Sequence, residues 1–182
     1  LFPEIAALFG VPQPPKHHPE IDTGVHVMLV LDQAARLSTD TRVRFAALLH
    51  DLGKGVTPPA DWPQHIGHEQ AGAALVNEFC KRLRVPNDYR DLALLVARYH
   101  AHAHRAEELK PATLLDTLEA MDAFRRPERV EMFVLACMAD ARGRTGHEDA
   151  PYPQADIFRM AFEAARGVDT AAVARSGGKG PE

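Results

Sequence analysis

The sequence predicts an all-α fold of about seven to nine helices. Apolar residues recur at intervals of three and four over most of the chain, as they do on one face of a helix. No stretch alternates apolar and polar residues over the length of a strand, and Pro and Gly separate the periodic segments. At 182 residues, 46% hydrophobic and 25% charged, the chain suits one compact domain with its own core.

The periodic segments are predicted to be helices in chain order. They are 1–9, 20–37, 41–51, 67–83, a segment capped by Asn87 or Asp88 that runs to about residue 100, 111–124, 127–140 and 154–166, with a turn or two at 170–175. The intervening stretches 11–19, 101–110 and 141–153 are predicted to be loops and turns. The loop 56–66 contains Trp62 and three prolines, and we expect it to form a rim or lid.

Composition excludes several classes of function. A net charge of −4 and a pI near 6.2 argue against a strongly basic platform for nucleic acid. Cys80 and Cys137 lie in apolar helical patterns, which predicts buried reduced thiols and a cytoplasmic protein. No signal peptide and no apolar run long enough for a membrane span are present. Both ends look cut, so we expect residues 1–19 to link to a preceding region, residues 20–175 to form the domain and residues 176–182 to be a truncated tail.

The stretch LLHDLGKG at residues 48–55 is the first indication of chemistry. His50 and Asp51 would sit about 100° apart on a helix, so they can share a metal ion only at its end. We expect Gly53 and Gly55 to turn the chain there, because glycine adopts positive φ. A capped surface turn with a solvated aspartate is the alternative.

Two further residues favour the metal site. His26 lies inside the predicted helix 20–37, where an ordinary core histidine is the alternative. Asp140 ends a helix that is otherwise apolar for nearly two turns, so its burial is costly without a cation or hydrogen bonds. A carboxylate also meets the unfavourable end of the dipole there. With His50 and Asp51, these residues would make a shell of two histidines and two carboxylates that suits a divalent metal.

The order His26, His50-Asp51, Asp140 resembles the HD superfamily of metal-dependent phosphohydrolases. The resemblance is closest to the C-terminal HD domain of bacterial multifunctional CCA-adding tRNA nucleotidyltransferases, and it covers nearly the whole chain. It is carried by HPEIDTGVH (18–26), VRFA (43–46), LHDLGKG (49–55), TPP (57–59), GHE (67–69), RLRVPN (82–87) and ADARGRTG (139–146). In that family a nucleotidyltransferase region precedes this segment, so CCA addition is not expected of this chain alone.

The resemblance implies an HD-domain helical bundle with 2′,3′-cyclic phosphodiesterase, 2′-nucleotidase and phosphatase activity. The expected partners are a tRNA 3′ end or a 2′,3′-cyclic or 2′-phosphorylated nucleotide. No membrane partner is expected, and a homodimer is possible. Nickel or magnesium is expected by resemblance, while His and carboxylate ligands would also accept Mn, Co or Zn. Such an ion would activate a water and polarise a phosphoryl oxygen, and Asp51 would orient that water or accept its proton.

Residues around the four ligands are candidates for substrate contacts. Lys54 could reach a phosphate over the metal, and Arg142 and Arg144 could clamp phosphate or ribose; solvated surface side chains are the alternative for all three. His68 could bind substrate, protonate a leaving oxygen or join a second metal, or it could simply begin a helix. His100 is expected to face the pocket. The other histidines are expected to lie in loops or face solvent, although His18 could close over the site: His17, His18, His65, His102, His104 and His147.

Two other functions remain open from the sequence. The same fold and metal could serve a 5′-nucleotidase or another nucleotide phosphohydrolase, in which case residues 142–144 and 57–62 would have to form the specificity pocket. A non-catalytic module that binds tRNA or dimerises is a different class. The complete ligand set and the acidic balance argue against that module, because phosphate binding needs clustered positive charge.

Overall fold

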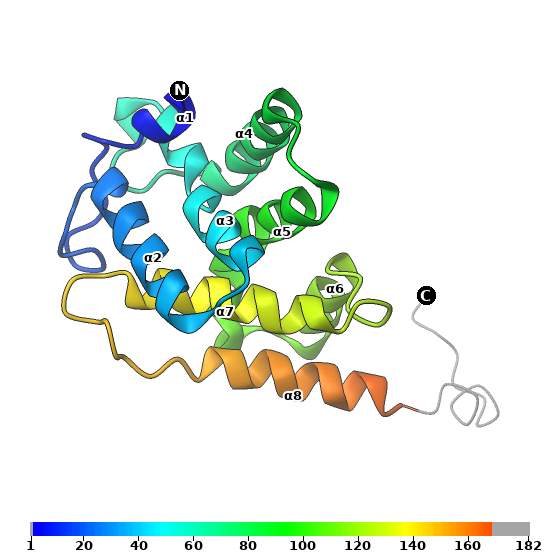
Figure 1. Ribbon diagram of the computed structural model, residues 1–182. Coiled ribbons are helices and arrows are strands. Elements are labelled where there is room, and N and C mark those ends of the chain that lie inside the picture. Colours follow the sequence, from blue (N-terminus) through cyan, green and yellow to red (C-terminus); the bar gives the residue numbers. More distant parts are fainter. Residues whose placement is uncertain (1, 169–182) are drawn as a thin grey trace.

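Residues 2–168 are described by the computed structural model, and they form an all-α fold (Figure 1). The α-helices are α1 (Pro3–Ala6), α2 (Thr23–Leu37), α3 (Thr41–Leu49), α4 (His68–Leu83), α5 (Asn87–His104), α6 (Pro111–Ala120), α7 (Glu128–Arg142) and α8 (Gln154–Arg166), with 3₁₀ turns η1 (Leu52–Val56), η2 (Pro59–Asp61) and η3 (Ala106–Glu108). Within 2–168 no strand forms, only an isolated bridge between Pro12 and Asp22. The predicted fold class is therefore confirmed, while the turn expected at 170–175 and the tail at 176–182 lie outside the described residues.

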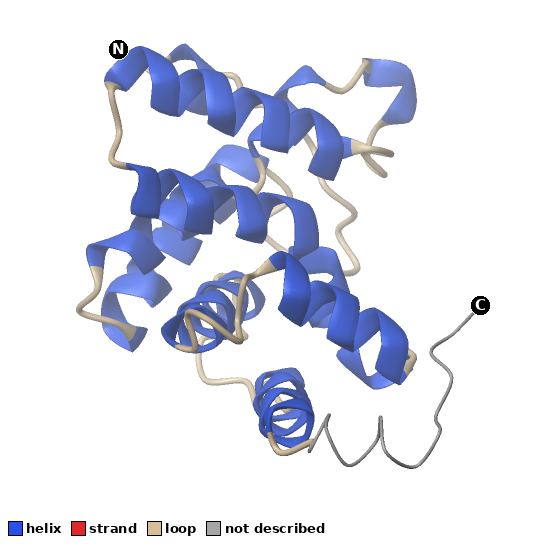
Figure 2. Ribbon diagram, turned by 90° about the vertical axis from the view of Figure 1, so that its right-hand side faces the viewer, coloured by secondary structure: helices blue, strands red, loops and turns tan. Residues whose placement is uncertain are grey.

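Helix α7 is central to the packing. It contacts α2, α3 and α5 and, separately, α8, which in turn packs on α6. Helices α4 and α5 lie side by side, and α5 also contacts α3. Figure 2 shows the same stack of helices from the side. This arrangement brings segments from across the sequence, α2, the end of α3, the start of α4, α5 and α7, to one interior region.

Side-chain caps fix where two of these helices begin. Asp22 accepts a hydrogen bond from the Val25 amide, so α2 begins at residue 23 rather than 20. Asp40 accepts from the Arg42 amide and begins α3 as predicted. The expected cap at Asn87 or Asp88 is wrong, because Pro86 holds that position without a side-chain bond.

Several helix ends differ from the prediction. Helix α5 continues four residues beyond 100 because Ala103 is a strong helix former and is buried, so the start of 101–110 is helical. Helix α3 ends two residues early, at Leu49, and α7 extends two residues past Asp140. Helix α6 stops at Ala120 rather than near 124, since Asp122 adopts a positive φ of 58°. Helix α1 covers only Pro3–Ala6 of the predicted 1–9, and irregular turns follow.

Gly53 and Gly55 are required for close packing and not for positive φ, which corrects the expectation above. Neither has a positive φ, and both lie in η1. A Cβ on Gly53 would lie 1.9 Å from the His68 carbonyl oxygen, so the absent side chain lets η1 touch the start of α4. A Cβ on Gly55 would meet the backbone of Ala7 at 3.3 Å. Gly53 thus brings His68 next to His50 and Asp51.

The apolar core extends from the first helices to the last. Leu8, near the N-terminal end, is fully buried in the same cluster as Leu49, Phe133 and Phe158. Cys80 and Cys137 are buried free thiols, as predicted. The N-terminal residues therefore pack as part of the same body that carries the site.

Candidate metal centre

Three side chains from α2, the end of α3 and α7 form what we call the inner group: His26, His50 and Asp140. Their exposed fractions are 0, 1 and 3%. Asp140 Oδ1 lies 3.1 Å from His26 Nε2 and 3.6 Å from His50 Nε2. One ligand atom from each residue lies within 4.8 Å of the others, which is close enough to surround one ion.

A second set, the outer group, comprises Asp51, His68 and His100. Asp51 Oδ1 lies 3.6 Å from the Nε2 atom of each histidine, and these two Nε2 atoms are 3.4 Å apart. The other oxygen of Asp51, Oδ2, lies 3.2 Å from His50 Nε2 in the inner group. Asp51 is therefore shared between the two groups, with Oδ2 near His50 and Oδ1 near His68 and His100.

Backbone carbonyls orient three of the four histidine rings in the two groups. In each case Nδ1 donates to a carbonyl oxygen, so Nε2 is the ring nitrogen that faces the cluster and could bind a metal. The pairs are His50 with Ala47 (2.7 Å), His68 with His65 (2.9 Å) and His100 with Val96 (3.0 Å). His26 differs, because its Nδ1 contacts Gly143 O at 3.2 Å and a Glu20 oxygen at 2.9 Å.

Unsatisfied buried atoms indicate that these residues fit a cation. His50 Nε2 and Asp51 Oδ1 are both buried and have no hydrogen-bond partner among the described residues. Buried polar atoms are almost always paired, since leaving one unpaired costs about 1–3 kcal/mol. Imidazole nitrogens and carboxylate oxygens are ligands for Zn, Mn, Fe, Co and Ni. Both observations fit a divalent metal held between the two groups.

The carboxylates are held in the ionised form. Burial alone would raise the pKa of Asp140, but His50 and His104 outweigh it and hold that pKa well below its ordinary value. Burial also opposes ionisation of Asp51, where His50 and Lys54 lower the pKa in the same way. Both groups are therefore anionic at neutral pH and available to a cation.

His26 and His100 differ in protonation. Burial works to lower the pKa of His26, but hydrogen bonds to Asp140 and Glu20 raise it to about 9. Burial lowers the pKa of His100 to about 3, because no hydrogen-bonded carboxylate compensates for it. Without a metal, His26 is protonated at neutral pH and His100 is neutral.

The other predicted residues are placed as follows. Lys54 Nζ donates to Asp51 Oδ2 at 2.7 Å and to Gln13 Oε1 at 2.6 Å. Arg144 lines the hollow of about 110 Å³ over the cluster, and its buried Nε has no partner within 2–168. Arg142 is not brought to the cluster, since its Nε donates to the Ala150 carbonyl and it lines a separate surface hollow.

The prediction that His104 faces solvent is wrong. Its Nε2 donates to Asp140 Oδ2 at 2.6 Å, and its Nδ1 lies 3.0 Å from the Tyr152 hydroxyl. The extra turn of α5 carries His104 there. Because the proton sits on Nε2, His104 orients Asp140 and is not itself a ligand through that atom.

Two further residues at the site were missed from the sequence. Glu20 contacts His26 and also accepts from the Thr145 amide at 3.2 Å. Gln13, fully buried, accepts from Lys54. A carboxylate six residues before a ligand histidine was a usable signal for Glu20, but nothing in the Pro-rich segment marked Gln13.

The remaining histidines have varied surroundings. His18 lines the hollow, and burial lowers its pKa to about 3. His65 is buried rather than a free loop residue, with its ring between the Thr57 hydroxyl (2.6 Å) and the Pro12 carbonyl (2.8 Å). His102 is half-buried, so the prediction that it faces solvent is only partly right. His17 and His147 are exposed.

The loop 56–66 does not line the hollow over the cluster. Trp62 Nε1 donates instead to the carbonyl oxygen of Thr57, at 3.2 Å. The residues that surround the mouth come from other segments, namely His18, Lys54, Ala101, His104 and Arg144.

Among the described helices, none has the length and apolar character that crossing a membrane requires.

Comparisons with known proteins agree with this geometry. The family model described as HD domain matches residues 23–126, which include His26, His50, Asp51, His68 and His100. The chain is similar to proteins named "Multifunctional CCA protein": 66% identical over 88% of its length in Thioalkalivibrio sulfidiphilus, 59% over 96% in Nitrosospira multiformis and 58% over its full length in Pseudomonas syringae pv. syringae. It spans 39, 42 and 45% of these relatives. No solved structure matched the chain.

Proposed function

The chain belongs to the HD domain family, and we propose that its cluster of histidines and aspartates is the active site of a metal-dependent phosphohydrolase. One observation carries the proposal. The inner and outer groups meet at the carboxylate of Asp51, where His50 Nε2 and Asp51 Oδ1 are buried without a hydrogen-bond partner among residues 2–168. A site built only for stability would pair those atoms with each other or with the backbone.

The inner group and Asp51 would hold the ion, so that His26, His50, Asp51 and Asp140 supply two nitrogens and two carboxylates. When bound there, a divalent ion would acidify a water molecule and polarise a phosphoryl oxygen. We propose nickel or magnesium. The outer histidines, His68 and His100, share Asp51 and would hold either a second ion or the substrate.

Charged side chains at the mouth would bind the phosphate. Lys54 and Arg144 both line the hollow, although they are far apart in the sequence. The Nε of Arg144 has no partner within the described part of the chain, and a phosphate oxygen can accept a hydrogen bond from it. Lys54 lies 2.7 Å from Asp51, where it would place a second positive charge beside the phosphate and help keep Asp51 ionised.

We propose that the substrate is a 2′,3′-cyclic phosphate or a 2′-phosphate at an RNA end, and specifically at the 3′ end of tRNA. The support for tRNA is the name of the relatives, which refers to CCA, the sequence at which tRNA ends. The chain would be the hydrolytic part of such a protein, and nucleotide addition would need residues beyond it.

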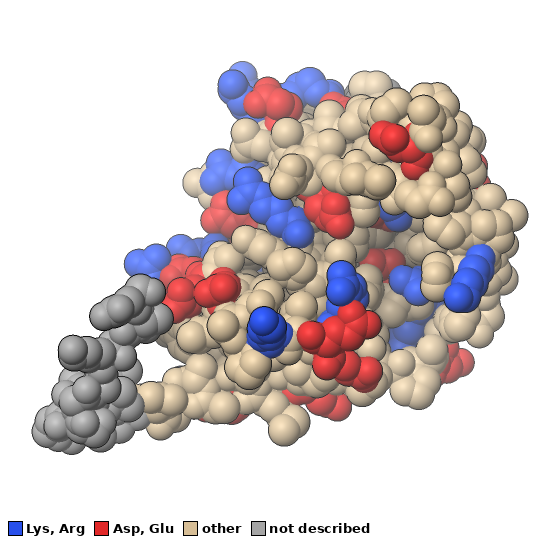
Figure 3. All heavy atoms as spheres, turned by 180° about the vertical axis from the view of Figure 1, so that it is seen from behind, with Lys and Arg blue, Asp and Glu red and all other residues tan. Residues whose placement is uncertain are grey.

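The surface gives less support to a pure RNA-binding module. Positive and negative side chains are interspersed over the face in Figure 3, without a continuous basic field. The chain's net charge of −4 points the same way. Binding of RNA without chemistry depends on many neutralised phosphates, so a site with a few positive groups beside a metal cluster favours hydrolysis.

The test is hydrolysis of 2′,3′-cyclic AMP by the purified chain after chelation, with Ni, Mn or Mg restored separately. We expect metal-dependent release of a monophosphate. Asp51→Asn should lower kcat/KM at least about 10³-fold, because Asp51 contacts both groups. Asp32→Asn, an exposed aspartate of α2, is the matched control and should retain activity. Absence of turnover with every metal, in a folded protein that binds metal, would contradict the proposal and favour the module.

A further inference from the structure

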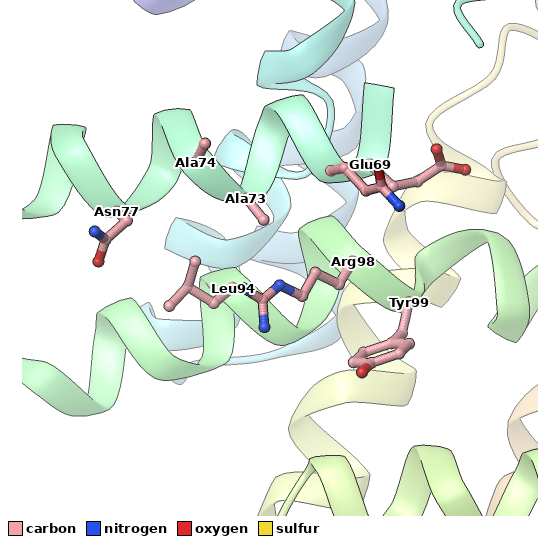
Figure 4. A pocket seen from close by; sticks show the side chains of 8 residues that line it. Glu69, Ala73, Ala74, Asn77, Leu94, Arg98 and Tyr99 are labelled. Carbon is pink, nitrogen blue, oxygen red and sulfur yellow. The ribbon is translucent and has the colours of Figure 1, made fainter. Parts of the chain in front are cut away.

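A second hollow, of about 710 Å³, lies outside the cluster, in the groove between α4 and α5. Small side chains of α4, Ala73 and Ala74, line it, and Ala73 points toward α5, which contributes Leu94 (Figure 4). Lining residues run from Glu69 to Asn77 along α4, which is about 12 Å at the rise of a helix. The groove is therefore long and narrow rather than a compact cavity.

The groove carries polar groups that have no structural task. Arg98 is exposed and makes no hydrogen bond or ion pair to another described residue, and Figure 4 shows its side chain running along α5 toward Leu94. Gln70 and Asn77 add two carboxamides from α4, and neither is engaged in a side-chain hydrogen bond within 2–168. Carboxamides both donate and accept, as the edges of nucleobases do.

One end of the groove adjoins the cluster. Glu69 Oε2 lies 3.5 Å from Nδ1 of His68, whose Nε2 faces Asp51. On α5, Tyr99 directly precedes His100 and is only half-buried. Glu69 and Tyr99 appear together at one end of the view in Figure 4, with Asn77 at the other. The imidazole of His68 therefore separates the groove from the hollow over the metal ligands.

We propose that this groove binds the nucleotides that precede the reacting phosphate, so that the site prefers the end of an RNA strand to a free mononucleotide. The inference rests on the proposed function. With the terminal phosphate at Lys54 and Arg144, the strand would leave past His68 and run along α4 and α5.

The chemistry of the groove fits a single-stranded ribonucleotide chain. The ring of Tyr99 offers a face on which a base stacks, and stacking tolerates any base. Arg98 offers a forked donor to one backbone phosphate. Glu69 would repel a phosphate next to His68 but can accept from a 2′-hydroxyl, which sets the direction of the ribose. A single arginine suits one or two nucleotides and not an extended duplex.

The experiment compares 2′,3′-cyclic AMP with an oligoadenylate of four residues that ends in a 2′,3′-cyclic phosphate. For the unmodified chain we expect kcat/KM to be about tenfold higher for the tetranucleotide, mainly through a lower KM. Equal values for the two substrates would overturn the proposal.

Two variants test the groove by different routes. Arg98→Ala removes the phosphate donor, and Ala74→Trp fills the groove from an exposed position of α4. Each should reduce the ratio of the two kcat/KM values to near one. Arg125→Ala, which removes an exposed arginine paired only with Asp122 within the described residues, is the charge-matched control and should keep the ratio. If the ratio survives in both groove variants, the proposal is wrong.

Binding without turnover separates this inference from the proposed function. In chelator, fluorescence anisotropy of a labelled tetra-adenylate with a 3′-phosphate should show weaker binding by Arg98→Ala and Ala74→Trp than by Arg125→Ala. If the variants differ in binding but the chain hydrolyses no substrate, the groove proposal is supported and the proposed hydrolase function is wrong. If the chain hydrolyses the mononucleotide but all variants bind the tetra-adenylate equally, only the groove proposal is wrong.

Discussion

The inner and outer groups contain the same residue types but differ in protonation. In the inner group, Asp140 and Glu20 contact His26 at 3.1 and 2.9 Å and raise its pKa to about 9. In the outer group, one carboxylate serves two histidines at 3.6 Å, and burial lowers the pKa of His100 to about 3. A carboxylate at hydrogen-bonding distance therefore decides whether a buried histidine carries a proton. A metal ion that binds His26 must displace that proton, whereas the ring of His100 is already neutral.

Removing one residue from each group should give the largest contrast. Asp140→Asn should weaken metal binding by about 100-fold or more, because Asp140 contacts His26, His50 and His104. His100→Gln should leave one tight ion in the inner group. Calorimetric titration together with metal analysis measures both. Equal loss of metal in the two variants would show that the groups act as one site.

The next largest effect should come from the packing between η1 and α4. Gly53→Ala places a Cβ 1.9 Å from the His68 carbonyl, so the free energy of unfolding should fall by about 1–3 kcal/mol. The shift of His68 should disturb the outer group before the inner one. Urea unfolding measures the loss, and Gly167→Ala is the control because its Cβ would meet nothing closer than 3.4 Å. Equal stability of the two variants would contradict the tight contact.

The protonation difference predicts a pH dependence. The pKa of His26 is raised to about 9, so metal-free protein binds an extra proton when folded. This contribution to stability is present below the ordinary histidine pKa and is lost as the pH rises to about 9. Metal affinity should rise over the same interval. Glu20→Gln should lower the pH at which affinity becomes constant, measured by metal titration at several pH values. An unchanged dependence of metal affinity on pH in Glu20→Gln would show that Glu20 does not raise the pKa of His26.

The smallest effect is expected at Tyr152. Its hydroxyl lies 3.0 Å from His104 Nδ1, two contacts away from the inner group. Tyr152→Phe should reduce metal affinity by less than about tenfold, because only the orientation of His104 is loosened. Tyr89→Phe removes a hydroxyl that bonds Thr41 and serves as the control. Metal affinity equal to that of the control would show that Tyr152 does not support Asp140.

The sequence predicted the features that depend on local pattern. Helix α8 has the predicted bounds, since its apolar spacing is regular and Pro153 precedes it. Asp140 is awkward in a purely structural role, and a metal ion shared with His26, His50 and Asp51 explained its position. The structure brings these four residues together.

Features that depend on tertiary packing were not predictable. His104 reaches Asp140 only because α5 continues past His100, which is decided by the burial of Ala103 and Ala106 against other helices. Gln13 lies in a Pro-rich segment without periodicity, and its contact with Lys54 joins residues 41 positions apart. Gly53 and Gly55 are needed for close packing against segments far from them in sequence, namely the start of α4 for Gly53 and Ala7 for Gly55.

The contacts of Pro12 and Gln13 bear on protein engineering. Removal of the residues that precede α2 would keep His26, His50, Asp51 and Asp140. Lys54 would nevertheless lose its contact with the Gln13 side-chain oxygen, and His65 would lose its contact with the Pro12 carbonyl. Both losses fall on groups that are buried within a few residues of Asp51 or His68. A fragment that preserves these contacts must therefore begin before Pro12, and grafting the helices that carry His26, His50, Asp51 and Asp140 would leave the contacts behind.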